Sequence, residues 1–395
     1  MTSEEILITG SPCRRRMRRE DRRVVALLGF LHGVVHANIL AIPVFLNFAW
    51  RDEFHADPLT LGLLFAIGFG LYGVGAVPFG FLADRRAPGR LLLLSAVGIG
   101  GSMASVAVSP SIPALAVSLG ALGFSSAIYH PTGLAVISRR VAEQGRAMGW
   151  HGMGGSLGIA AGPAFVGAAL SIGWSWRLVA GALILPAVAA ASLLLIAPLP
   201  HDPAGGQGSV VSRRALFTGP FILVLLVYMF AGFAYQGGLA FLPLFVGPGL
   251  FAFALACGAV GQVASGRLAE RPRPERALFA LSFAGALLLL LLALFASGGQ
   301  PGSLFGGTAI VFGLVLFSLE PLQNTLVTGE APRPLRGSAF GFAFLSVFGI
   351  GAIGAILAGW LLQQNQNAVL FLVLGLSMVA SGTAALGVRR KTAGS

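Results

Sequence analysis

Apolar residues occur along this chain in long runs that short polar segments separate. A helical run of about 20 apolar residues crosses the roughly 30 Å hydrocarbon core of a bilayer. The sequence predicts twelve such runs, approximately at 24–48, 59–83, 90–108, 112–137, 146–170, 174–198, 216–240, 247–268, 277–296, 303–328, 337–361 and 367–388. None shows the alternating polarity of a membrane β-strand, so each is expected to be a helix.

The longest polar interruption is His201–Arg214, which is rich in Gly, Pro and Ser and predicts a flexible linker. It divides the runs into two sets of six. The sets share short sequence patterns in the same order, as internal repeats do. The matching pairs are Gly80–Arg85 with Gly266–Arg271, His36–Pro43 with Gln236–Pro243, and Tyr129–Pro131 with Leu319–Pro321.

These features predict an all-α membrane protein with twelve transmembrane helices in two pseudo-symmetric six-helix bundles. The predicted parts are a basic cytoplasmic tail (1–23), an N-terminal bundle (24–198), a cytoplasmic linker (199–215), a C-terminal bundle (216–388) and a second cytoplasmic tail (389–395).

The net charge of +12 reflects orientation in the membrane. If the N-terminus is cytoplasmic, all but Arg51 and Arg177 of the 26 basic residues fall in inside segments. This partition follows the positive-inside rule and predicts that both termini are cytoplasmic. Lys391 is the only lysine among the 26 basic residues, and such a preference for arginine over lysine is typical of GC-rich bacterial genomes. We therefore expect a multi-pass protein of the bacterial cytoplasmic (inner) membrane, with the lipid bilayer rather than nucleic acid as partner.

The loop after the second run, Gly80 to Arg90 (GFLADRRAPGR), resembles the loop signature of the major facilitator superfamily. Gly158 to Gly167 (GIAAGPAFVG) in the fifth run resembles the helix-five motif of that family's exporting antiporters. His32 and the Tyr129-His130-Pro131 segment resemble the fosmidomycin-resistance branch. The resemblance implies a transporter whose two bundles alternate access to a site between them.

The loop signature implies a gate on the cytoplasmic side. Its expected residues are Asp84, Arg85 and Arg90, with Glu270 and Arg271 in the second copy. An acid near a helix N-terminus and beside a cation forms a contact that can be made and broken. The alternative is a tight, positively charged turn.

In the fifth run, Gly154, Gly158 and Gly162 recur every four residues and precede Pro163. Such glycines form a smooth face for close helix packing, and a proline bends a helix. The face is expected either to serve packing alone or also to seal the cytoplasmic path, as the antiporter resemblance implies.

Glu320 is the only one of the 14 acidic residues that lies well inside a run. A carboxylate there costs on the order of 3 kcal/mol and usually faces a cavity. His32, His130 and Glu320 each lie roughly 11–12 Å from the cytoplasmic end of their run at 1.5 Å per residue. In this fold runs one, four, seven and ten line the cavity. The predicted substrate and proton cavity contains His32, His36, Asn38, Tyr129, His130, Tyr235, Gln236, Glu320 and Asn324.

Three interpretations of these groups remain open. Glu320 and a histidine can exchange protons, because imidazole titrates near neutral pH. His32 and His36, spaced i and i+4, can bind a transition metal, with His130 as a further ligand. The histidines can also be purely structural. Cys13 and Cys257 are too far apart to form a metal cluster or a disulfide framework.

No phosphate-binding Gly-Lys-Ser/Thr sequence is present, so ATP has no binding loop and no enzyme activity is expected. The predicted function is proton-coupled export of a small organic molecule by a monomer that needs no cofactor besides the proton. The alternatives are a transition-metal permease, an importer or facilitator of a small metabolite, and a receptor-like protein that does not transport.

Overall fold

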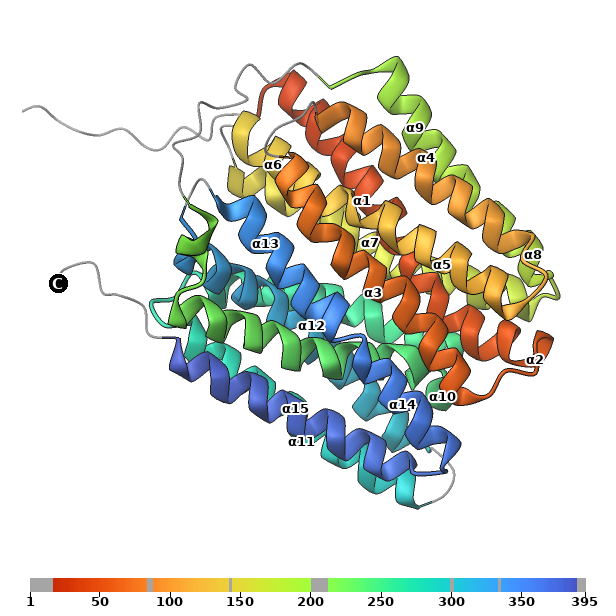
Figure 1. Ribbon diagram of the computed structural model, residues 1–395. Coiled ribbons are helices and arrows are strands. Elements are labelled where there is room, and N and C mark those ends of the chain that lie inside the picture. The colour runs from red at the N-terminus through yellow and green to blue at the C-terminus, as the bar shows by residue number, and fades with distance from the viewer. Residues whose placement is uncertain are drawn as a thin grey trace, which may run out of the picture.

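The computed structural model describes residues 17–83, 88–141, 144–199, 212–298, 302–332 and 335–388, and these residues form helices and connections without a strand (Figure 1). The first half contains α1 (Arg19–Phe45), the π-helix η1 (Leu46–Trp50), α2 (Arg51–Glu53), α3 (Pro58–Ala83), α4 (Pro88–Ala107), α5 (Ile112–Ala127), α6 (Tyr129–Arg140), α7 (Gln144–Ser171), α8 (Trp176–Ala182) and α9 (Ile184–Ile196). The second half contains η2 (Arg213–Leu216), α10 (Gly219–Ala269), α11 (Pro274–Ser297), α12 (Ser303–Glu330), α13 (Arg336–Phe344), the π-helix η4 (Leu345–Ile350), α14 (Ile353–Gln363) and α15 (Asn367–Gly387).

Within this described part, 11 helices are long and apolar enough to cross a membrane. One of them, α10, has 51 residues and contains two crossings, because its backbone leaves the helical conformation at Gly247 (φ 78°, ψ 163°). The predicted set of twelve membrane helices is thus present. The predicted gap at 241–246 was wrong, since this apolar stretch continues the seventh crossing to the break.

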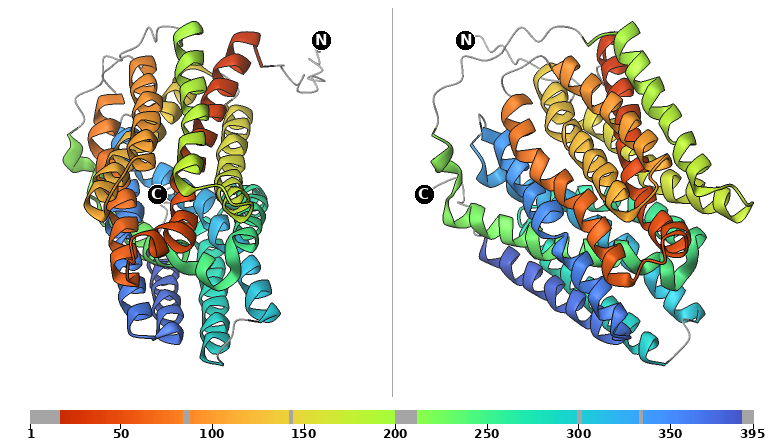
Figure 2. Two further views of the ribbon diagram at one scale, coloured as in Figure 1. Left: turned by 90° about the vertical axis from the view of Figure 1, so that its right-hand side faces the viewer. Right: turned by 45° about the vertical axis from the view of Figure 1, so that its right-hand side comes forward.

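The helices form two bundles, α1–α9 and α10–α15, which Figure 2 shows from two further directions. Their outer helices expose large apolar side chains, including Leu185 and Ile196 on α9 and Leu287 and Leu294 on α11. Exposing such an apolar surface to water costs free energy, whereas contact with lipid chains does not. The chain is a multi-pass membrane protein.

A seam of small residues joins α1 to α7 inside the first bundle. A Cβ atom added to Gly154 would overlap the Gly29 carbonyl oxygen, and one added to Gly158 would overlap that of Gly33. At Gly162 the same atom would overlap the Ala37 oxygen. The four-residue spacing of glycines therefore serves close packing against α1, and α7 continues as one helix through Pro163.

The two bundles meet along two lines. On one side, α3 packs lengthwise against α13, η4 and α14; on the other, α7 packs against the second part of α10. Between these lines, at the far end of α1, the side-chain amide of Asn47 donates a hydrogen bond of 2.8 Å to the Ala240 carbonyl oxygen. The space that remains enclosed by these contacts is the candidate site.

Candidate functional site

A cavity of about 70 Å³ lies between the bundles. The first bundle lines it with His36 from α1, His130 from α6 and Ile159 from α7. The second bundle contributes the larger share, and most of its side chains are aromatic or amide groups around one carboxylate. These residues are Tyr228, Ala231, Tyr235, Leu316, Phe317, Leu319, Glu320, Gln323, Asn324, Phe344, Val347 and Phe348.

Glu320 is the one carboxylate among the described residues that line this cavity, and its side chain is exposed there. The Gln262 amide donates a hydrogen bond of 2.7 Å to Glu320 Oε2. The oxygen of the same amide accepts a 3.0 Å hydrogen bond from the Ser156 hydroxyl on α7. A chain of two hydrogen bonds therefore connects the carboxylate to the opposite bundle. One turn beyond Glu320, Asn324 Oδ1 accepts a hydrogen bond of 2.8 Å from the Tyr228 hydroxyl.

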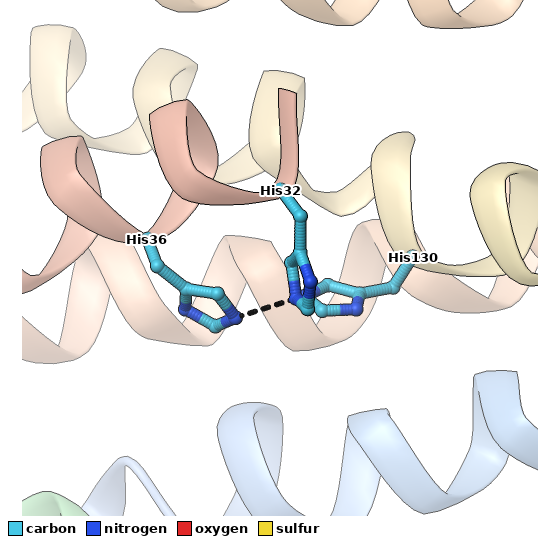
Figure 3. A group of neighbouring side chains, drawn as sticks. All are labelled: His32, His36 and His130. Atoms are coloured by element: carbon cyan, nitrogen blue, oxygen red, sulfur yellow. Dashed lines mark hydrogen bonds between the residues drawn. The ribbon is translucent and has the colours of Figure 1, made fainter. Parts of the chain in front are cut away.

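The first bundle places three imidazole rings together, as Figure 3 shows. His36 Nε2 lies 3.0 Å from His32 Nε2 within α1. The His130 ring, from α6, lies with its centroid 4.9 Å from that of His32 and 5.2 Å from that of His36. His32 and His130 are only 8% and 7% exposed. The rings therefore form one compact cluster at the wall of the cavity.

A second layer supports this cluster from α7. The His151 ring stacks on His32 at 4.2 Å between centroids, and the His151 carbonyl oxygen accepts a hydrogen bond of 3.0 Å from His32 Nδ1. The Tyr129 hydroxyl donates to the Leu28 carbonyl oxygen and lies 2.8 Å from His151 Nε2. Gly155 provides the space, because an added Cβ would overlap the His32 ring.

The structure separates the residues predicted for the cavity into three groups. His36, His130, Tyr235, Glu320 and Asn324 line it. His32 and Tyr129 stand behind this wall, in contact with the lining histidines.

Asn38 and Gln236 do not line the cavity. Asn38 is buried and donates a hydrogen bond to Val34 O in its own helix, and Gln236 is buried with its amide 3.4 Å from Val347 O. The reason is helix geometry. A side chain two residues beyond His36 points about 200° away from it, since each residue turns an α-helix by about 100°.

Two predicted gate residues, Asp84 and Arg85, lie outside the described residues. Arg90 lies in the first turn of α4, and Glu270 and Arg271 follow the end of α10; all three are exposed. Gly158, Gly162 and Pro163 lie in the buried face of α7.

Ser156 and Gln262 are functional candidates that the sequence interpretation missed. Gln262 had a usable signal, because a primary amide inside an apolar run calls for a hydrogen-bonding partner as Glu320 does. Ser156 had none, since serine is common in membrane helices and bonds to its own backbone. Only the contact between α7 and α10 gives it a role.

Two helix bundles that enclose a polar cavity at their interface are the architecture of a secondary transporter. The sequence matches the model of the Major Facilitator Superfamily over residues 25–353, so the chain belongs to this family. It is a transporter rather than an enzyme.

Solved structures share this fold. A bacterial homolog of the human lysosomal transporter Spinster, in an inward-facing and occupied conformation, has a TM-score of 0.71 at 17% identity, covering 94% of this chain and 96% of that one. The nucleoside transporter NupG gives 0.73 at 15% identity, with coverage of 93% and 99%. The peptide transporter POT, in complex with sulfate, gives 0.72 at 15% identity, with coverage of 92% and 93%. No curated protein matches the sequence.

Proposed function

We propose that this transporter exports a small amphipathic organic molecule in exchange for protons, with Glu320 as the proton-carrying group. The observation that carries the proposal is the position of Glu320. It is a carboxylate exposed to the cavity between the bundles, hydrogen-bonded to Gln262 of its own bundle and through Gln262 to Ser156 of the other. A group at this place meets each side of the membrane in turn as access alternates. A carboxyl group in a poorly hydrated cavity binds a proton readily and releases it when water returns.

The bridge through Gln262 links the charge of Glu320 to the contact between the bundles. When Glu320 is ionised, its oxygen accepts a charge-assisted hydrogen bond from the Gln262 amide, which is stronger than a neutral one. The Ser156 hydroxyl holds that amide from α7. Protonation weakens the first bond, so it loosens one of the contacts that join α7 to α10. The proposal is that this change lets the bundles separate on one side.

The cavity wall supports an amphipathic cargo. Aromatic rings of Tyr235, Phe317 and Phe348 face it together with the amides of Gln323 and Asn324. Apolar walls with a few placed polar groups are typical of sites for small organic molecules. The sequence resemblance to the fosmidomycin-resistance branch makes fosmidomycin the first compound to test, and ethidium is a suitable second probe of amphipathic character.

The orientation proposed for this cycle has both termini in the cytoplasm of a bacterium. It rests on the arginine partition, with the exposed Arg18, Arg19, Arg22 and Arg23 at the start of α1. The Asp84 loop is proposed as the cytoplasmic gate that closes during the outward-facing half of the cycle.

Glu320→Gln tests the coupling role, because it keeps the shape of the side chain and removes its titration. In proteoliposomes with an imposed pH gradient, we expect the wild type to accumulate fosmidomycin or ethidium against its gradient. The variant should bind the same compound and exchange it passively, yet lose the pH-driven accumulation. The matched control is Asp52→Asn, an exposed carboxylate far from the cavity, which should behave as the wild type. Wild-type accumulation by Glu320→Gln would contradict the proposed role, and absence of transport in the wild type at either sign of gradient would contradict the proposed cargo.

A further inference from the structure

The three imidazole rings of His32, His36 and His130 are in contact with one another. One ligand atom from each lies within 4.8 Å of the others. In Figure 3 the rings of α1 and α6 point toward one another. Nitrogens that bind a tetrahedral zinc ion at about 2.0–2.1 Å lie roughly 3.3 Å apart, so a small contraction brings this set to a metal site.

Hydrogen bonds define which nitrogen of His32 carries the lone pair. Its Nδ1 lies 3.0 Å from the His151 carbonyl oxygen, which can only accept, so Nδ1 carries the hydrogen. The lone pair is then on Nε2, which accepts a hydrogen bond of 3.0 Å from His36 Nε2. A metal ion would take the place of the hydrogen between these two nitrogens. A backbone carbonyl that holds the far nitrogen of a histidine is the usual support for a metal ligand, because it fixes both tautomer and ring orientation.

The other two rings have nitrogens without partners. His36 Nδ1 and His130 Nε2 are buried, and neither has a hydrogen-bond partner within the described residues. A buried polar atom left unpaired costs free energy, and a water molecule or an ion can supply the partner that it lacks. A bound cation would supply the partner that His130 Nε2 lacks. A cluster that served packing alone would gain nothing from these unpaired nitrogens.

His151 belongs to the support and not to the ligand set. The Tyr129 hydroxyl gives its hydrogen to the Leu28 carbonyl oxygen, so its own oxygen accepts from His151 Nε2. That nitrogen is therefore occupied. His151 is thereby fixed, and its carbonyl oxygen is directed at His32.

We propose that His32, His36 and His130 bind a divalent transition-metal ion of the zinc type. All three ligands are neutral imidazoles, which suit zinc, copper, nickel and ferrous iron rather than magnesium or calcium. Three protein ligands leave a fourth coordination position for water or a donor atom of a cargo molecule. His36 and His130 line the cavity, so this position opens toward it. The site goes beyond the proton coupling proposed for Glu320 and does not depend on it.

The test uses the purified full-length chain, freed of any affinity tag and stripped of metal, titrated with ZnCl₂ in a calorimeter. We expect one zinc ion per chain. His36→Ala and His130→Ala should each lower the affinity by at least about tenfold, since each removes one ligand of three. Co²⁺ should give the visible absorption of tetrahedral nitrogen coordination with the wild type and not with the variants.

Two controls distinguish this site from zinc binding elsewhere on the chain and from the proton site. His55→Ala removes an exposed histidine outside the cluster and should leave binding unchanged. Glu320→Gln should also bind zinc as the wild type does, so a failure of the proton proposal leaves this one standing. The unfolding temperature of His36→Gln, measured without metal, shows whether the variant is folded. A folded variant that does not bind zinc has lost the site and not the fold. Absence of stoichiometric zinc binding by the wild type, or equal binding by the folded His36 and His130 variants, would overturn the proposal. Loss of binding in His55→Ala would overturn it as well.

Discussion

His130 and Glu320 occupy matching places in the two bundles, and the bundles treat them differently. Each lies in a helix that lines the cavity, and each comes directly before a proline. His130 is 7% exposed, with the rings of His32, Tyr72 and Phe344 around it. Glu320 is exposed to the cavity and accepts a hydrogen bond from the Gln262 amide.

The comparison shows that the position in the repeat determines how deep a side chain lies in its bundle. The neighbouring helices determine which groups surround it. The α1–α7 seam brings His151 behind the histidines, where it bonds to His32 and to Tyr129 of α6, and the wall consists of closely packed rings. In the second bundle the facing helix supplies the Gln262 amide, and the wall around Glu320 combines apolar rings with amide and hydroxyl groups. One bundle thus presents a fixed ligand set and the other a group that can change its charge.

The largest effect on stability is expected when each of the two residues is replaced by the other. His130→Glu puts a carboxylate among the rings of His32, Tyr72 and Phe344 and should destabilise the protein by on the order of 3 kcal/mol. Glu320→His places an imidazole in the polar wall and should cost well under half of that. Unfolding temperatures in one detergent would measure both. Equal losses would mean that the two walls do not differ in polarity.

The glycine seam between α1 and α7, which lies behind the histidine cluster, is the next point to test. Gly158→Leu introduces a side chain where even a Cβ would overlap the Gly33 oxygen, so α1 and α7 must separate. Overpacking of this kind typically costs about 1–3 kcal/mol, and we also expect zinc affinity to fall because His32 moves. Gly152→Leu is the matched control, since nothing lies within 4 Å of an added Cβ there. A stable Gly158→Leu protein with normal zinc affinity would show that the seam does not position the histidine cluster.

Ser156→Ala should have the smallest effect, and it tests the polar wall from the opposite bundle. It removes the hydroxyl that holds Gln262, a hydrogen bond worth about 1 kcal/mol. We expect slightly lower thermal stability and a pH-driven accumulation that is weakened rather than lost. Ser171→Ala, near the end of the same helix, removes only a bond to the Ala168 backbone oxygen and should change neither property. Unchanged coupling in Ser156→Ala would show that Glu320 acts without the bridge.

Much of the fold could be predicted from the sequence, because membrane spans depend on local composition. Apolar runs, the linker and the repeat define twelve helices in two bundles without any knowledge of packing. Glu320 could be found for the same reason, since a single carboxylate inside an apolar run is costly wherever its helix lies. His36 and His130 followed from depth and the family's arrangement of spans.

The remaining parts of the site depend on contacts between distant segments. Ser156 and Gln262 are 106 positions apart, and only the packing of α7 against α10 joins them. The role of the His151 carbonyl arises because glycines let α7 approach α1 closely. Asn38 and Gln236 were assigned to the cavity as polar residues of spans that line it in this fold, although both side chains are buried away from it.

The break at Gly247 has a mechanical consequence. Where the structure describes the whole connection between two spans, as at 54–57 and 108–111, several residues of turn or loop join them and can absorb a displacement of one helix. Spans seven and eight share a single non-helical residue, and Pro248 at the restart packs against Gly167 of α7. The seventh span, which carries Tyr235, and the eighth, which carries Gln262, are therefore joined by one residue of backbone rather than by a loop. The covalent chain thus connects a span that lines the cavity directly to a span that packs against the opposite bundle.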